Sequence, residues 1–303
     1  MAMVPLALAI VMLSPAQRLP PDPAVPIGVW YAAPASAEAG VLRENFNTIR
    51  RAGFDSITVP VIWRDAEPRR GTFSLLATER AIAAAGVAGL KVRVKVITDV
   101  HPEWATTVTA ATVFLDYVRR RVLLHSAVVT VEAAGSHEVA PHERVRIGSA
   151  AGAVSLREAR FLMWTALAEG RRAVSFDDGA NGASDHMLAL GEVAGVVTRN
   201  QALFGPLRPR EGPSTGAAVE GGAGGVEVRI LESTDAMVIV GLNRADAVQK
   251  VTLRFSPEIP EAIWQNIEEG TAVNFVMGKD GPFFAHVFAP RDALVLTIRK
   301  KLR

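Results

Sequence analysis

The alternation of two kinds of segment between residues 27 and 204 constrains the fold of this chain more than any other feature. Short apolar runs rich in β-branched residues predict strands at 27–31, 56–63, 92–98, 128–133 and 173–176. Other stretches repeat apolar residues three and four positions apart, and these predict helices at 37–52, 75–88, 112–123, 156–168 and 186–203. Strands that alternate with helices form parallel sheets with right-handed crossovers. The sequence therefore predicts an α/β fold.

The number of these units indicates a barrel that is not complete. A TIM-type (β/α) barrel has eight units and takes at least roughly 200 residues. Only five units fit between residues 27 and 210. We therefore predict a shortened or incomplete TIM-type barrel over 27-210, with three strands and their connections missing.

The pattern changes after Pro213. Residues 211-225 are small and rich in glycine, which predicts a linker or mobile loop. Short strand-like segments with turn signals between them then follow over 226-303, and residues 243–246 and 278–281 are typical of hairpin loops. This part predicts a small antiparallel β-sandwich domain.

The first residues, 1-26, are expected to form a separate segment. Residues 3–13 are an apolar run, too short for a membrane span, which needs roughly 17–25 residues. The run matches the apolar region of a secretory signal, although no Lys or Arg precedes it, and a proline-rich linker follows. We expect a secreted or periplasmic protein without a stable membrane span, and the alternative is a cytoplasmic protein.

The composition excludes several classes of site. Lys and Arg number 33 against 31 Asp and Glu, so the chain lacks the basic excess typical of nucleic-acid binding. The absence of cysteine excludes disulfides, iron–sulfur clusters and thiolate zinc sites. His137 and His142 have no metal-ligand spacing, and Asp177 and Asp178 open a segment that lacks the glutamate of a calcium loop. No metal and no cofactor are predicted.

The segment from residue 57 to residue 104 resembles a known family. Five residues match the pattern W-x-x-x-E-P-x-x-G-x-F/Y after the second strand, and two match P-x-W after the third: Trp63, Glu67, Pro68, Gly71 and Phe73, then Pro102 and Trp104. These motifs resemble glycoside hydrolases of the (β/α)8-barrel clan whose fourth and seventh strands end in glutamates, and most nearly the family-42 β-galactosidases. The helix and last strand at 155–176 and the β domain are also similar to that family.

The resemblance implies a retaining hydrolase of a β-linked sugar, which needs two carboxyl groups about 5–5.5 Å apart. Glu132 ends a predicted strand and resembles the family's nucleophile. In a competing alignment the same stretch is the fourth strand, and Glu138 stands for the acid. One stretch thus has to fill both roles, and this is the main departure from the family.

Loops after the carboxyl ends of barrel strands converge on one face. The resemblance places the substrate-binding residues there, and the candidates are Trp63, Asp99, His101, Trp104 and Asp177. The expected partner is an oligosaccharide or polysaccharide, not a nucleic acid.

Two alternatives stay open. The chain is either a hydrolase or a non-catalytic carbohydrate-binding or assembly protein that retains a glycosidase barrel, in which Glu132 is a strand-end carboxylate held by an arginine. An incomplete barrel also exposes strand edges, which invite pairing, so a homo-oligomer that covers them is a further expectation.

Overall fold

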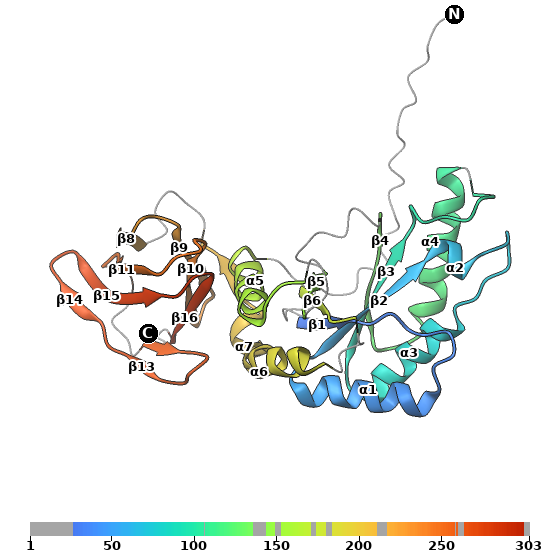
Figure 1. Cartoon of the computed structure of the whole chain (residues 1–303), viewed down its shortest axis with the longest axis horizontal. Coiled ribbons are helices and arrows are strands. Elements are labelled where there is room, and N and C mark those ends of the chain that lie inside the picture. Colours follow the sequence, from blue (N-terminus) through green and yellow to red (C-terminus); the bar gives the residue numbers. More distant parts are fainter. Residues whose placement is uncertain are drawn as a thin grey trace, which may run out of the picture.

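The computed structural model describes residues 27–105, 107–135, 144–148, 153–170, 174–179, 184–210, 217–257, 259 and 264–299. It consists of two domains along the longest axis, joined through α5 (Figure 1). The signal-like segment 1-26 lies outside the described residues, as do His137, Glu138 and His142.

The first domain is built on one parallel sheet of six strands. Its strands are β1 (Ile27–Trp30), β2 (Ser56–Ile62), β3 (Lys91–Ile97), β4 (Val128–Ala134), β5 (Val145–Arg146) and β6 (Val174–Asp177). They lie in the order β4-β3-β2-β1-β6-β5, and all are parallel to their neighbours. The five predicted strands are confirmed, and β5 is an addition that the sequence did not predict.

This order is that of a TIM barrel with a gap. Strands β1 to β4 follow one another, and β6 lies on the other side of β1, where the last strand of a barrel belongs. The described part of the chain thus lacks two of eight strands rather than the three we expected, because β5 occupies the seventh position. The edges of the sheet are β4 and β5. Pairing of these edges with a second copy stays a prediction.

Helices cover one face of the sheet. They are α1 (Ala39–Ala52), α2 (Trp63–Ala66), α3 (Leu76–Val87), α4 (Val108–Val122), α5 (Leu156–Ala168), α6 (Asp185–Arg199) and α7 (Gln201–Phe204). The helix α1 ends at Gly53, whose φ of 114° is left-handed. A side chain there would meet the carbonyl oxygen of Gly191 in α6 at 2.3 Å, so glycine allows both the turn and the close approach of the two helices.

The two faces of the sheet differ in polarity, as β3 shows. Val92, Val94 and Val96 are buried in the core that the helices share. Side chains alternate between faces along a strand, so the residues between these valines, Lys91, Arg93 and Lys95, lie on the opposite face. We call this face, on the inside of the partial barrel, the inner face.

The second domain is a sandwich of two antiparallel sheets. One has the order β13-β12-β16-β10-β9-β7 and the other β14-β15-β11-β8. The bounds are β7 (Arg208–Pro209), β8 (Ala217–Gly221), β9 (Val226–Glu232), β10 (Ala236–Asn243), β11 (Gln249–Phe255), β12 (Trp264–Asn266), β13 (Ala272–Val273), β14 (Val276–Gly278), β15 (Gly281–Phe288) and β16 (Asp292–Arg299). A second apolar core, with Phe255, Trp264 and Phe288, lies between the sheets.

Two details of the β domain differ from the sequence predictions. The segment 211-225 is not a linker throughout, because Ala217–Gly221 forms β8 and pairs with β11. Residues 243–246 do not close a hairpin, since β10 and β11 belong to different sheets. The hairpin at 278–281 is confirmed by the pairing of Gly278 with Gly281.

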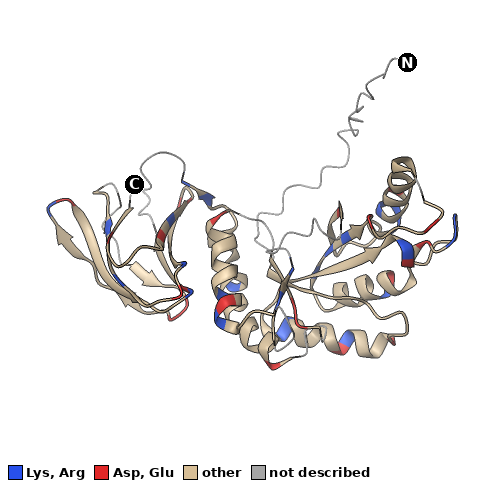
Figure 2. Ribbon diagram, turned by 45° about the horizontal axis from the view of Figure 1, so that its top comes forward, with Lys and Arg blue, Asp and Glu red and all other residues tan. Residues whose placement is uncertain are grey.

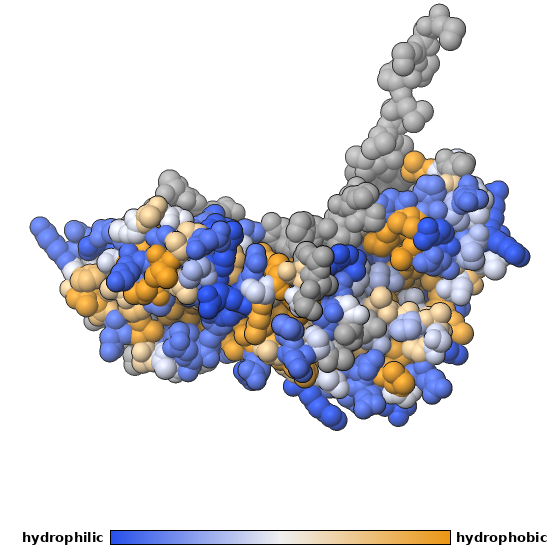
Figure 3. Space-filling view, in the orientation of Figure 1, coloured by the Kyte–Doolittle hydropathy of each residue, from blue (hydrophilic) through white to orange (hydrophobic). Residues whose placement is uncertain are grey.

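The helix α5 holds the two domains together. It packs against β9, β10 and β16, and Trp164 is fully buried there, with its indole N–H donating to Glu268 at 3.1 Å. On the face shown in Figure 3, hydrophobic residues form a band where the domains meet and separate patches elsewhere. None of the helices in the described part of the chain is long and apolar enough to span a membrane.

Candidate functional site on the inner face

A small hollow lies on the inner face of the sheet. Strands β1, β2, β3, β4 and β6 contribute its lining, which consists of Trp30, Thr58, Arg93, Val94, Lys95, Thr130, Glu132 and Ser175. The register of the sheet explains why these residues meet, since Trp30 pairs with Thr58, Thr58 with Arg93, and Arg93 with Thr130. The hollow has a volume of about 10 Å³, which is room for about one water molecule.

Glu132 is held between two cations in this hollow. Its Oε1 accepts a hydrogen bond from Nη2 of Arg93 at 3.0 Å, and its Oε2 accepts one from Nζ of Lys95 at 3.1 Å. The side chains of Arg93 and Lys95 are only 17% and 11% exposed, whereas that of Glu132 is 39% exposed. The carboxylate therefore lies nearer to solvent than the cations that hold it.

Hydroxyl groups form the rest of the polar lining. Thr58 and Ser175 bond to each other through their hydroxyl oxygens at 2.7 Å, in a buried position. The hydroxyl oxygen of Thr130 is also buried, but it has no hydrogen-bond partner in the described part of the chain. A buried hydroxyl without a partner costs free energy, so Thr130 offers the hollow an unused donor and acceptor.

Trp30 links the hollow to Asp177. The guanidinium group of Arg144 lies over the Trp30 ring, 4.7 Å from its centre, in a cation–π contact. The same group donates to Oδ2 of Asp177, at 2.9 Å from Nε and 2.7 Å from Nη2. Asp177 is thus fixed by an ion pair at the end of β6, beside the hollow but outside its lining.

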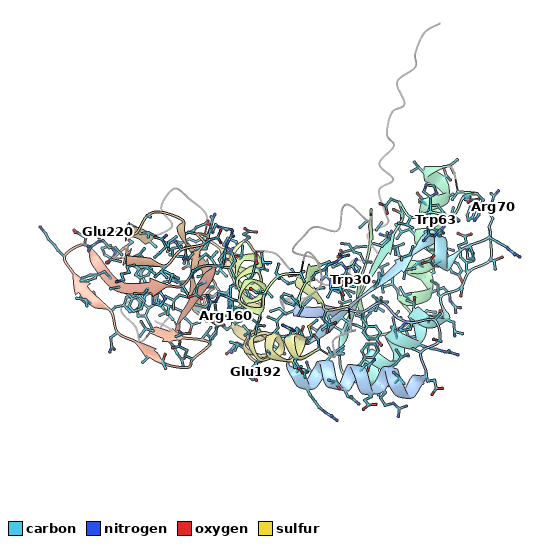
Figure 4. The ribbon with its side chains drawn as sticks, in the orientation of Figure 1. Trp30, Trp63, Arg70, Arg160, Glu192 and Glu220 are labelled. Atoms are coloured by element: carbon cyan, nitrogen blue, oxygen red, sulfur yellow. The ribbon has the colours of Figure 1, made fainter. Side chains whose placement is uncertain are left out.

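The aromatic residues after β2 and β3 form a separate group. Trp63 stacks on Phe114 of α4 at 5.3 Å and meets Trp104 edge-on at 6.0 Å. The side chain of Trp63 is only 2% exposed, and its indole N–H donates to Glu67. The prediction that Trp63 binds substrate is therefore wrong, because almost none of this residue is accessible. Figure 4 shows Trp63, the first residue of α2, well away from Trp30.

The loop after β3 carries the other candidates near this aromatic group. Trp104 is half-buried, and no described residue bonds to its indole N–H. His101 is exposed and lies edge-on to Trp63 at 6.2 Å, and Asp99 is exposed. None of these three residues lines the hollow that holds Glu132, so the structure does not gather the predicted acids and indoles around one site.

The place of Glu132 in the sheet decides between the two alignments. Its strand β4 pairs with β3, with Glu132 opposite Lys95. It therefore stands on the fourth strand and not on the seventh, and the alignment that made it the nucleophile is wrong. Glu138, the acid of the competing alignment, lies outside the described residues.

Sequence reasoning missed Trp30, Arg93, Lys95 and Thr130 as site residues. A signal was present in the run of residues 91–96, where two lysines and an arginine alternate with three valines. Strands buried on both faces are instead nearly continuous in apolar residues. The alternation indicated a strand with one polar face, and that face is the lining of the hollow.

Comparisons with known proteins agree with this fold. No protein-family model matches the sequence, and no curated protein is significantly similar to it. Among solved structures, a protein of Bacteroides fragilis assigned as an α-galactosidase is 10% identical, with a TM-score of 0.57 over 93% of this chain and 80% of that one. The maltogenic α-amylase AmyB of Thermotoga neapolitana is 10% identical, with a TM-score of 0.56 over 90% and 98%.

The α-fucosidase of Thermotoga maritima is 12% identical, with a TM-score of 0.52 over 85% of this chain and 78% of that one. Identities this low concern the fold alone. The chain therefore has the fold of the TIM-barrel glycoside hydrolases, as a six-stranded partial barrel followed by an antiparallel β domain.

Proposed function

We propose that this protein binds a carbohydrate on the inner face of its partial barrel and does not cleave it. The observation that carries the proposal is the double ion pair of Glu132 with Arg93 and Lys95. Both carboxylate oxygens of Glu132 are engaged in these pairs, and a nucleophile must leave them to attack carbon. A carboxylate fixed in this way is suited to accepting hydrogen bonds from sugar hydroxyl groups.

The lining supports binding in a second way. Hydroxyl and charged groups from four strands converge on one concave patch next to the Trp30–Arg144 pair. Polar groups held by a rigid sheet can fix the orientation of a sugar with little loss of side-chain freedom.

A direct test uses a variant that blocks the inner face. Thr130→Phe would place a ring in the hollow, and Thr252→Phe makes the same change on β11 of the β domain, where Thr252 is also half-buried. We expect Thr130→Phe to weaken the binding of β-linked galacto-oligosaccharides about tenfold or more, measured by titration calorimetry, which corresponds to about 1.4 kcal/mol. Circular dichroism checks that both variants are folded. Equal binding by both variants would contradict the proposal.

Retaining hydrolysis of a β-galactoside by Glu132 and Glu138 is the second candidate. The fourth strand is one of the two that end in glutamates in the glycosidases this sequence resembles, so the place of Glu132 there favours a role as the acid and not as the nucleophile. The test is the release of nitrophenol from aryl β-galactosides. Binding without cleavage predicts no release by the native chain. Release that Glu132→Gln abolishes would establish hydrolysis and overturn our proposal.

A further inference from the structure

The cations of the inner face suggest which sugars this site selects. We infer that the hollow anchors the carboxylate of an acidic sugar, a uronic acid unit, in preference to a neutral sugar. This inference rests on the proposed carbohydrate-binding function and deepens it. The lining has three charged side chains. Those of Arg93 and Lys95 are the least exposed, and the carboxylate of Glu132 is the most exposed.

Arg93 has N–H donors that make no hydrogen bond to the described part of the chain. A guanidinium group carries five N–H donors, and one of them, on Nη2, binds Glu132. Within the described part of the chain Arg93 has no further partner. Hydrogen bonds from a largely buried guanidinium to a carboxylate are about twice as strong as bonds between neutral groups. A carboxylate is therefore the ligand group that this side chain favours.

The size of the hollow selects the same group. About 10 Å³ holds one water-sized atom, so a carboxylate oxygen fits, whereas a pyranose ring does not. The ring of the bound sugar would lie above the hollow, on the open side of the sheet, with its acid group pointing down. The sugar would then bury only the part of itself that carries the charge.

Thr130 adds a donor on the floor of the hollow. Its buried hydroxyl has no partner among the residues that the structure describes, and a hydroxyl can donate its proton to a carboxylate oxygen. The neighbouring hydroxyls of Thr58 and Ser175 already satisfy each other. An incoming carboxylate thus gains one bond from Thr130 without breaking an existing one.

Glu132 sets the charge balance of the site. With a ligand carboxylate present, the two cations of the lining, Arg93 and Lys95, face two anions. The more exposed carboxylate, that of Glu132, is left at the rim, where it can accept a bond from a sugar hydroxyl. Figure 2 shows that Lys and Arg are interspersed with Asp and Glu along both domains, so the selectivity comes from this local arrangement and not from an overall field.

The test compares three matched ligands by titration calorimetry on the full chain: trigalacturonate, its methyl ester and galactotriose. We expect trigalacturonate to bind about tenfold or more tightly than the other two, which is the effect of one charge-assisted hydrogen bond. The difference in affinity between trigalacturonate and the neutral ligands should become smaller as the salt concentration is raised. In the Arg93→Gln variant, trigalacturonate and its methyl ester should bind with nearly equal affinity.

The control for the loss of charge is Lys250→Gln, which removes an exposed cation from β11 of the β domain and should leave the difference between these two affinities unchanged. Thr130→Val keeps every charge and nearly the same volume, so it tests the site even where Arg93→Gln fails to fold. We expect Thr130→Val to weaken trigalacturonate binding several-fold and the binding of the ester less.

Each outcome decides a separate point. Equal affinity for the acid and its ester would overturn the inference and leave the proposed binding function intact. Acetate that competes as strongly as trigalacturonate would also overturn it, since the sugar would then contribute nothing. If none of the three ligands binds, the inference fails, and the proposed function is then decided by the titration with β-linked galacto-oligosaccharides.

Discussion

Trp63 donates its indole N–H to the carboxylate of Glu67 over 2.9 Å, and both side chains are buried at the end of β2. The other carboxylate oxygen of Glu67 accepts the backbone N–H of Gly71 at 2.8 Å. The spacing of Trp63, Glu67 and Gly71 thus builds a closed turn. In this chain the motif that resembles a sugar-site segment has a structural role.

We therefore predict that Glu67→Ala destabilises the protein. The change leaves the buried indole N–H of Trp63 without an acceptor, and a buried unsatisfied group costs about 1–3 kcal/mol, so we expect a loss of about 1–3 kcal/mol in the free energy of unfolding. Urea denaturation followed by tryptophan fluorescence measures it. Glu103→Ala, a change at an exposed residue of the next loop, is the control and should have little effect. Equal stability of the two variants would show that the turn is dispensable.

The contact between the domains provides a second prediction. Arg160 of α5 donates to Glu268 and to Asp292, each at 2.8 Å, and to the carbonyl oxygen of Ala293 (Figure 4). Removing one partner of a largely buried ion pair leaves the other charges uncompensated. We expect Arg160→Met to lower stability by about 2–3 kcal/mol, after allowance for partial exposure of the group.

Calorimetry provides the readout for Arg160. Because α5 connects the partial barrel to the β domain, the variant should also separate the melting of the two domains into two transitions. Arg64→Met, at an exposed residue paired with Asp65, is the matched control. A single unchanged transition in Arg160→Met would refute the coupling.

Local periodicity was sufficient to predict five of the six parallel strands and the helices between them. Periodicity failed to predict two strands that form because a neighbouring strand pairs with them, and not because their own residues have a strand pattern. The two residues of β5 are too short to have a pattern, and they are a strand because β6 lies beside them. The glycine-rich segment Ala217–Gly221 is a strand because β11 provides a ladder of partners from Val251 to Phe255.

The site was predictable only in part, for a related reason. Glu132 was recognised as a strand-end carboxylate, but Arg93 and Lys95 lie 39 and 37 residues away in sequence, and only the register of β3 with β4 brings them to it. For an aromatic such as Trp63, sequence pattern does not distinguish a ring that faces solvent from one enclosed by helices. The packing of α4 decides that question.

A third prediction concerns pH. Burial raises the pKa of Asp55 above its usual value of 3.8, although Lys91 and the N–H of Ile27 oppose the rise. The native state therefore holds the proton more tightly than the unfolded state. The contribution of this group to stability is fully present below pH 3.8 and is lost as pH rises through the raised pKa.

Asp55→Asn should remove that dependence. We expect the free energy of unfolding of Asp55→Asn, relative to the native chain, to increase as pH rises through this window and then to stay constant. Urea titrations between roughly pH 4 and pH 7 measure it. Asp235→Asn, at an exposed position, should give a difference that does not change with pH. A difference for Asp55→Asn that is flat, or that falls with pH, would refute the prediction.

The last prediction tests how closely β1 approaches β2. A side chain at Gly28 would meet the hydroxyl oxygen of Ser56 at 2.5 Å and its backbone carbonyl oxygen at 2.6 Å. The backbone of a paired strand has little freedom to move, so Gly28→Ala should cost about 2–3 kcal/mol of stability through overpacking. Gly40→Ala is the matched control, because Gly40 lies in α1 with nothing within 4 Å of the added carbon. That variant should gain about 0.5 kcal/mol, since alanine restricts the unfolded chain and favours helix. Urea denaturation of the pair measures both effects, and a Gly28→Ala variant as stable as Gly40→Ala would mean that β1 and β2 are farther apart than described.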